Sequence, residues 1–126
     1  MGTVISIANQ KGGVGKTTTA INLASSLALL GKKILLIDLD YQANATTCMG
    51  IDRGSFEKCV FDCLIEEATI PEITITTENP LIDVLPAKTT VEAIEEKIIL
   101  NTNRDFILHT QLKEVKRNYD YILIDC

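Results

Sequence analysis

Apolar residues are concentrated in short runs that have the composition of buried β-strands. The runs at 3–9 (TVISIAN) and 32–38 (KKILLID) are rich in aliphatic residues, and a third lies at 119–126 (YDYILIDC). Continuous apolar runs are typical of strands that are covered on both faces of a parallel sheet. The run at 119–126 is among the most apolar, so we expect it at the centre of the sheet. A fourth strand, marked by prolines, is predicted at 79–87.

A helical pattern follows the first strand. From Lys16 onward apolar residues recur at helical spacing, and Gly31 supplies a signal for the helix to end. The residues that set this spacing are Ala20, Leu23, Ala24, Leu27 and Ala28. A strand, a helix and a strand in this order predict a right-handed βαβ unit with parallel strands.

The remainder of the chain predicts shorter elements. The polar segment 38–52 reads as a loop that feeds a short helix, and a helix is expected at 55–66. The apolar face of that helix would consist of Phe56, Cys59, Val60, Cys63 and Leu64. Thr89 and Glu92 have the spacing of a capping box and should open another helix. A last helix is predicted at 104–118.

Length and composition indicate one globular domain over residues 1–126. Apolar residues make up 46% of the chain and charged residues 23%, which argues against disorder. The net charge of −5 gives no overall attraction to nucleic acid or to an anionic membrane. No apolar run approaches the roughly 18 residues of a membrane helix, and no signal peptide is visible, so we expect a cytoplasmic protein without membrane contact.

Four cysteines, Cys48, Cys59, Cys63 and Cys126, are expected to be reduced thiols in that compartment. Cys59 and Cys63 are four residues apart and could share a helix face with a metal ion. No second pair of ligands stands nearby, so small apolar core residues are the favoured interpretation.

The segment GGVGKTT at 12–18 lies between the first strand and its helix, and it predicts a phosphate-binding loop. Glycines allow backbone amides to approach phosphate oxygens, and the helix directs its positive end at the same anion. The loop amides would come from Gly12, Gly13, Val14 and Gly15. Lys16 would reach the β- and γ-phosphates, Thr17 would bind Mg²⁺, and Thr18 could donate to the α-phosphate. The alternative is a tight glycine turn that binds no ligand.

Acidic residues end two of the predicted strands. Asp38 and Asp40 follow the second strand and would project to the same side, near the phosphate loop if the two strands adjoin. Asp125 ends the run YILID and has the position of a carboxylate that holds the water shell of Mg²⁺. Solvent-facing caps at the strand ends are the alternative interpretation for Asp38 and Asp125.

The loop departs from the plain phosphate-loop pattern, which would place glycine at residue 10. This chain has Gln10 followed by Lys11, and the string KGGVGKTT resembles the deviant Walker A motif of the ParA/MinD superfamily of ATPases. The resemblance implies that Lys11 reaches across an ATP-dependent homodimer to the partner's phosphates, as an arginine finger does. A solvated surface charge is the alternative role for Lys11.

A second motif supports the same resemblance. The segment DLDYQANAT at 38–46 is similar to the family's DLDPQGNAT, with Tyr41 in place of proline and Ala43 in place of glycine. The resemblance implies that Asp38 helps to hold Mg²⁺ through water and that Asp40 orients the attacking water. Lys11, Lys16 and Asp40 would then be the catalytic residues. Both replacements alter the stiffness of the loop beside Asp40.

The resemblance fits the ParA/Soj branch, which acts in chromosome or plasmid partition. It implies a P-loop NTPase three-layer α/β fold, with a mostly parallel sheet flanked by helices. Members of this branch work with a centromere-binding ParB-like protein and bind DNA nonspecifically on the nucleoid. They continue for about as long again after the last run, so we expect this chain to be the N-terminal portion. A truncated, non-catalytic remnant or interaction module and a MinD-like division-site ATPase are the alternatives.

Overall fold

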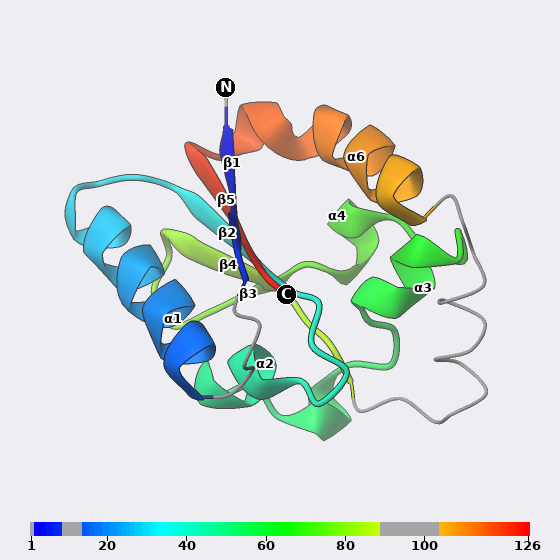
Figure 1. Ribbon diagram of the computed structural model, residues 1–126, viewed down its shortest axis with the longest axis horizontal. Helices are drawn as coiled ribbons and strands as arrows, with labels where there is room; N and C mark the ends of the chain where they lie inside the picture. The colour runs from blue at the N-terminus through cyan, green and yellow to red at the C-terminus, as the bar shows by residue number, and fades with distance from the viewer. Residues whose placement is uncertain (1, 9–13, 89–103) are drawn as a thin grey trace.

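A computed structural model describes residues 2–8, 14–88 and 104–126. These residues are arranged in three layers (Figure 1). A sheet forms the middle layer, helix α1 covers one face, and helices α3, α4 and α6 cover the other. The strands are β1 (Thr3–Ile7), β2 (Ile34–Asp38), β3 (Ile75–Thr76), β4 (Ile82–Leu85) and β5 (Tyr121–Asp125). This arrangement confirms the predicted three-layer α/β fold.

The strands are ordered β1-β5-β2-β4-β3 across the sheet. The first four are parallel to one another, and the short β3 pairs antiparallel with β4. In this register Asp125 of β5 lies between Ile7 of β1 and Asp38 of β2. The strands predicted at 3–9, 32–38 and 119–126 therefore lie side by side, and their carboxyl ends meet at one edge of the sheet. The strand predicted at 79–87 forms as β4, beside β2.

Burial follows from these positions. Every residue of β2 is buried, as expected for a strand covered on both faces. β5, which was predicted to be central, lies inside the sheet between β1 and β2, whereas β2 is the middle strand. The prediction that the first run is buried is wrong, because no residue of β1 is buried and two are exposed. β1 has β5 as its only ladder partner among the described strands, which leaves its other edge open.

Helix α1 (Val14–Leu29) packs through small side chains against one face of the sheet. Ala20, Ala24 and Ala28 are buried there against Ile34 and Leu36 of β2. The helix ends where predicted, because Gly31 adopts φ 80°, a left-handed conformation that glycine enters without steric cost.

The opposite face is covered by α3 (Val60–Leu64), α4 (Ile70–Ile73) and α6 (Arg104–Val115). Leu35 and Ile37, which alternate with the residues facing α1, point into this second core. The predicted helix at 104–118 thus forms as α6, followed by one 3₁₀ turn, η2 (Lys116–Asn118).

The expected helix at 55–66 is shorter than predicted. A 3₁₀ turn, η1, covers Arg53–Ser55, and Phe56 is extended. α3 begins only at Val60, because the Asp62 carboxylate accepts the backbone N–H of Cys59 at 2.8 Å and caps the helix there. The capping-box helix predicted to open at Thr89 falls outside the described residues.

All four cysteines are free thiols. Cys59 and Cys63 are buried, as expected of core residues, whereas Cys48 and Cys126 are exposed. Burial, together with the nearby Asp62 carboxylate, raises the pKa of the Cys63 thiol to about 12. Within the described part of the chain, no helix has the length and apolar character needed to cross a membrane.

Candidate functional site at the carboxyl edge of the sheet

Two residues of the phosphate loop meet the last strand. The Lys16 ammonium lies 3.0 Å from Oδ1 of Asp125 and also donates to the backbone carbonyl of Cys126. The Thr17 hydroxyl donates to Oδ2 of the same carboxylate at 3.1 Å. All three side chains are buried, and Asp125 has no exposed surface. The structure therefore brings together Lys16, Thr17 and Asp125 as the sequence predicted.

The rest of the loop is only partly described. Lys11, Gly12 and Gly13 lie outside the described residues, and of Val14 only its place at the start of α1 is described. Gly15 and Thr18 are exposed in the first turn of α1, beside the buried Lys16 and Thr17. The first turn of a helix has backbone N–H groups without helical partners, so this end of α1 suits an anion.

Asp38 is buried at the end of β2, and both oxygens of its carboxylate accept hydrogen bonds from the protein. Its Oδ2 accepts the backbone N–H of Thr46 at 2.9 Å and the Thr46 hydroxyl at 2.7 Å. Its Oδ1 accepts the backbone N–H of Asp40 at 3.0 Å. Burial raises the pKa of Asp38 above its ordinary value, although these hydrogen bonds oppose the rise. The nearby charge of Asp125 raises this pKa further.

Asp40 lies at the same edge of the sheet, but its carboxylate faces its own loop. Oδ1 accepts the backbone N–H of Gln42 at 3.0 Å. Oδ2 accepts the backbone N–H of Asn44 at 3.3 Å and its side-chain amide at 2.6 Å. Asn44 begins α2 (Asn44–Cys48), the short helix that the sequence predicted after this loop. Asp40 is therefore held in place by the loop that carries it.

Thr46, for which the sequence indicated no role, links two parts of the site. Besides its bonds to Asp38, its hydroxyl accepts the backbone N–H of Ala87 at 2.9 Å, just beyond β4. Thr46 has 1% of its surface exposed. It belongs to the segment DLDYQANAT, so the motif contained the signal, but the partner at Ala87 is remote in sequence.

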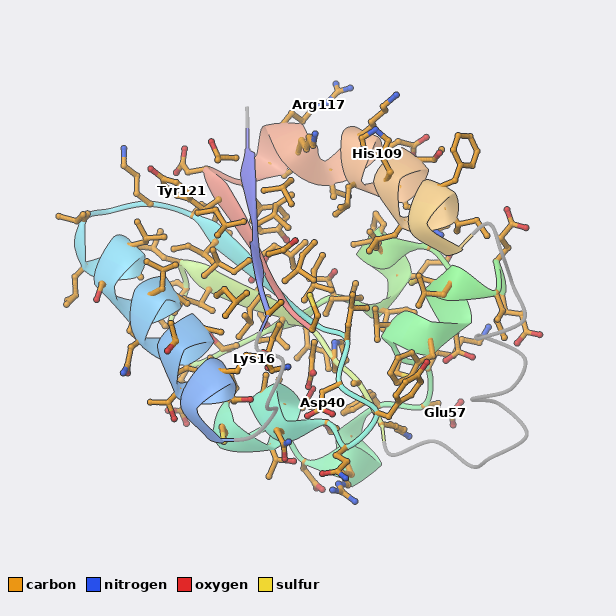
Figure 2. All side chains as sticks on the ribbon, viewed as in Figure 1. Lys16, Asp40, Glu57, His109, Arg117 and Tyr121 are labelled. Carbon is orange, nitrogen blue, oxygen red and sulfur yellow. The ribbon has the colours of Figure 1, made fainter. Side chains whose placement is uncertain are left out.

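Among the buried side chains described at this edge, negative charge exceeds positive charge. Asp38 and Asp125 are register neighbours without exposed surface, and Lys16 is the cation paired with one of them. Oδ1 of Asp125 accepts no hydrogen bond from the described residues and is satisfied only by that ion pair. Figure 2 shows Lys16 and Asp40 at this end of the sheet, with His109 and Arg117 at the opposite end.

A glycine-rich loop sequence that enters a helix, with a carboxylate at the end of a parallel strand contacting the first turn of that helix, defines the class of P-loop nucleotide-binding proteins. The family model described as "AAA domain" matches residues 2–126. The chain is 45% identical to the sporulation initiation inhibitor protein Soj of Bacillus subtilis over 126 residues, and 43% identical to the chromosome partitioning protein ParA of Caulobacter vibrioides over 125 residues. The chain therefore belongs to this AAA-domain family, as a sequence of the ParA/Soj type.

The fold is also similar to the folds of solved structures. A cobyrinic acid a,c-diamide synthase from Mycobacterium smegmatis, with a bound ATP analog and magnesium, superposes with a TM-score of 0.89 at 29% identity. The comparison covers 100% of this chain and 51% of that one. The match covers 100% of this chain and 50% of Soj, and 98% of this chain and 47% of ParA. The chain thus spans about half the length of these relatives.

Proposed function

We propose that this chain binds ATP with Mg²⁺ at the carboxyl edge of its sheet and hydrolyses ATP to ADP and phosphate. The observation that carries the proposal is the meeting of Lys16 and Thr17 with Asp125 at the first turn of α1. An ammonium group beside the N-terminus of a helix suits the phosphates of a nucleotide. The binding of nucleotide and magnesium is also supported by the superposed synthase, which holds an ATP analog and magnesium.

The donor set of the site fits Mg²⁺. This ion prefers oxygen ligands and is commonly held by one or two protein groups together with phosphates and water. Thr17 would hold the ion through its hydroxyl, and Asp125 and Asp38 would bind its water shell. The buried Oδ1 of Asp125, which accepts no hydrogen bond from the described residues, supports this assignment. The ion would neutralise charge on the β- and γ-phosphates.

Hydrolysis also needs a group that orients the attacking water, and we assign this role to Asp40. A carboxylate has about four acceptor positions. Its hydrogen bonds to Gln42 and Asn44 hold both oxygens while leaving acceptor capacity for a water molecule. Lys16 would leave its ion pair with Asp125 to contact the phosphates, which places a cation where negative charge develops.

We further propose that ATP binding joins two copies of the chain and that Lys11 of each copy contacts the phosphates of the other. The resulting switch would act in chromosome or plasmid partition, as the name of the Caulobacter relative indicates for that protein. A ParB-like, centromere-binding protein would stimulate hydrolysis. The dimer would bind DNA nonspecifically.

The nucleotide-binding part is tested by titrating a fluorescent ATP analogue with Mg²⁺ into three proteins. Lys16→Ala should weaken binding at least about tenfold, because a hydrogen bond to a charged group contributes roughly 1.5–3 kcal/mol. Lys32→Ala is the matched control, since Lys32 is an exposed lysine in the turn beyond α1. Equal affinities for the wild type and Lys16→Ala would refute the assigned site.

The dimerisation part is tested by light scattering with and without ATP. Lys11→Ala should bind ATP with unchanged affinity and stay monomeric, whereas the wild type becomes dimeric. Dimerisation of Lys11→Ala to the wild-type extent would refute the role in trans. Phosphate release decides between a catalytic switch and a non-catalytic remnant, because only the former turns ATP over.

A further inference from the structure

The carboxylate of Asp40 depends on a four-residue turn for its position. The backbone N–H of Ala43 donates to the carbonyl of Asp40 at 2.9 Å and closes the turn. Inside this turn the Asp40 carboxylate accepts the N–H of Gln42, and just beyond it the N–H of Asn44. Any change in the backbone shape of residues 41–43 would therefore move the acceptor oxygens of Asp40.

This turn contains an unfavourable backbone conformation. Ala43 has φ 58° and ψ 39°, in the left-handed region that residues with a Cβ atom enter at a steric cost. Ala43 is also fully buried, so its side chain cannot move into solvent to relax. A turn of this kind persists where contacts around it hold it in place.

Tyr41 supplies such a contact from the second position of the turn. Its ring stacks on the ring of Phe61, with the centroids 5.0 Å apart and the ring planes 18° from parallel. Phe61 belongs to α3 and is 3% exposed, so it is a fixed part of the core. Proline is favoured at the second position of such turns because its ring fixes φ. Tyr41 has no such covalent restraint, but its ring is held against Phe61 by the stack.

We propose that Tyr41 is a positioning residue that holds the Asp40 carboxylate in place through its stack on Phe61. The stack fastens the turn to α3, which lies on the sheet face opposite α1 (Figure 1). The part of this proposal that concerns catalysis rests on the proposed ATP hydrolysis. The part that concerns the turn itself does not need a nucleotide.

A purely structural role is the competing explanation, since Tyr41 is a half-buried member of the core around α3. Under that explanation the loss of the ring would lower stability throughout the protein. Under the positioning role the loss would loosen residues 40–44 specifically and reduce ATP turnover while ATP affinity is retained. A local exchange measurement and separate values of kcat and Kd distinguish the two.

The first experiment measures amide hydrogen exchange in the nucleotide-free protein. Tyr41→Ala should accelerate exchange at Gln42 and Asn44 about tenfold or more, which corresponds to about 1.4 kcal/mol of local opening. The amides of the interior strand β5 should exchange as in the wild type. Tyr41→Phe retains the stacking ring and should exchange as the wild type does. Phe61→Leu, which removes the ring from the other side, should also accelerate exchange at Gln42 and Asn44.

The second experiment measures ATP affinity and turnover in the same variants. Tyr41→Ala should bind ATP with wild-type affinity and lose about tenfold in kcat. Tyr41→Pro should recover much of this loss, because proline restrains the same turn position without a stack. Phe106→Ala is the control, because it removes an aromatic ring that is 71% exposed at the start of α6.

The proposal is overturned if Tyr41→Ala leaves exchange at Gln42 and Asn44 unchanged, or accelerates it equally in β5. It is also overturned if ATP turnover in Tyr41→Ala equals that of the wild type. A wild-type protein without ATP turnover would instead defeat the proposed function. In that case the exchange comparison alone decides whether Tyr41 holds the turn.

Discussion

The Thr17 hydroxyl donates a hydrogen bond to Oδ2 of Asp125 over 3.1 Å, although the two residues are 108 positions apart in the chain. The contact joins the first turn of α1 to the end of β5. It also places the proposed Mg²⁺ ligand, the Thr17 hydroxyl, next to a carboxylate that would bind the water shell of the ion.

Replacement of the hydroxyl should change how binding depends on the metal. Thr17→Val keeps the shape of the side chain and removes its oxygen, so ATP affinity should respond little to added Mg²⁺. Thr17→Ser keeps the oxygen and should respond as the wild type does. Titrations of ATP with Mg²⁺ and with a chelator measure the difference. An unchanged response to Mg²⁺ in Thr17→Val would contradict the assigned ligand.

Loss of the buried carboxylate should destabilise the nucleotide-free protein. Asp125→Asn leaves the Lys16 ammonium, which is 8% exposed, without its counter-charge. Removal of one partner of a buried ion pair typically costs about 3–5 kcal/mol in the free energy of unfolding. Urea unfolding measures this value. The double variant Lys16→Met, Asp125→Leu replaces both charges and should recover most of the loss, whereas a cost near zero for Asp125→Asn would show that the pair contributes little.

The Thr46 hydroxyl should matter more than its methyl group. Thr46→Val leaves the buried N–H of Ala87 unpaired and removes a donor from Asp38, at a cost of about 1–3 kcal/mol in unfolding free energy. Thr46→Ser keeps both hydrogen bonds and loses about 1 kcal/mol with the methyl group. The pKa of Asp38 should rise further in Thr46→Val only, because that hydrogen bond lowers it in the wild type. Equal unfolding free energies for the two variants would contradict the proposed bridge.

Tyr119, which lies just before β5 at the end of the sheet away from the proposed phosphate site, should have a raised pKa. The Tyr119 hydroxyl donates to Oδ2 of Asp83 at 2.8 Å, and Asp83 is paired with Lys33 at 3.3 Å. Burial, and next this hydrogen bond, raise the pKa of Tyr119 well above its ordinary value of about 10.

The folded protein therefore retains a proton that the unfolded chain releases above about pH 10, and stability falls as pH rises beyond that value. Ultraviolet titration of the phenolate should show a late-titrating group that is missing in Tyr119→Phe. The alkaline loss of stability should also be smaller in Tyr119→Phe. A titration with the same late group in both proteins would assign it to another residue.

The elements that local patterns dictate were predictable from the sequence. The apolar runs became β1, β2 and β5, and the stop signal at Gly31 ends α1. The meeting of Lys16 with Asp125 was predictable as well, because the carboxyl ends of parallel strands share one edge of a sheet. Each of these predictions needs only periodicity, glycine placement and the geometry of a βαβ unit.

Features that depend on remote partners were not predictable in the same way. The solvent exposure of β1 follows from its place at the end of the strand order rather than from its own composition. The stack of Tyr41 on Phe61 and the bond from Ala87 to Thr46 join segments whose approach no local pattern encodes. The late start of α3 reflects competition between helix propensity and a cap at Cys59, which periodicity alone does not resolve.

The place of β5 between β1 and β2 has a consequence for how the chain is made. A ribosome releases residues 3–7 and 34–38 long before residues 121–125, yet the first two segments have no direct ladder and are joined only through the third. Both apolar segments therefore lack this ladder until β5 emerges from the ribosome. Contacts of such long sequence separation slow folding and prolong exposure to aggregation. The joining of β1 to β2 through β5 and the meeting of Lys16 with Asp125 are consequently one event during synthesis.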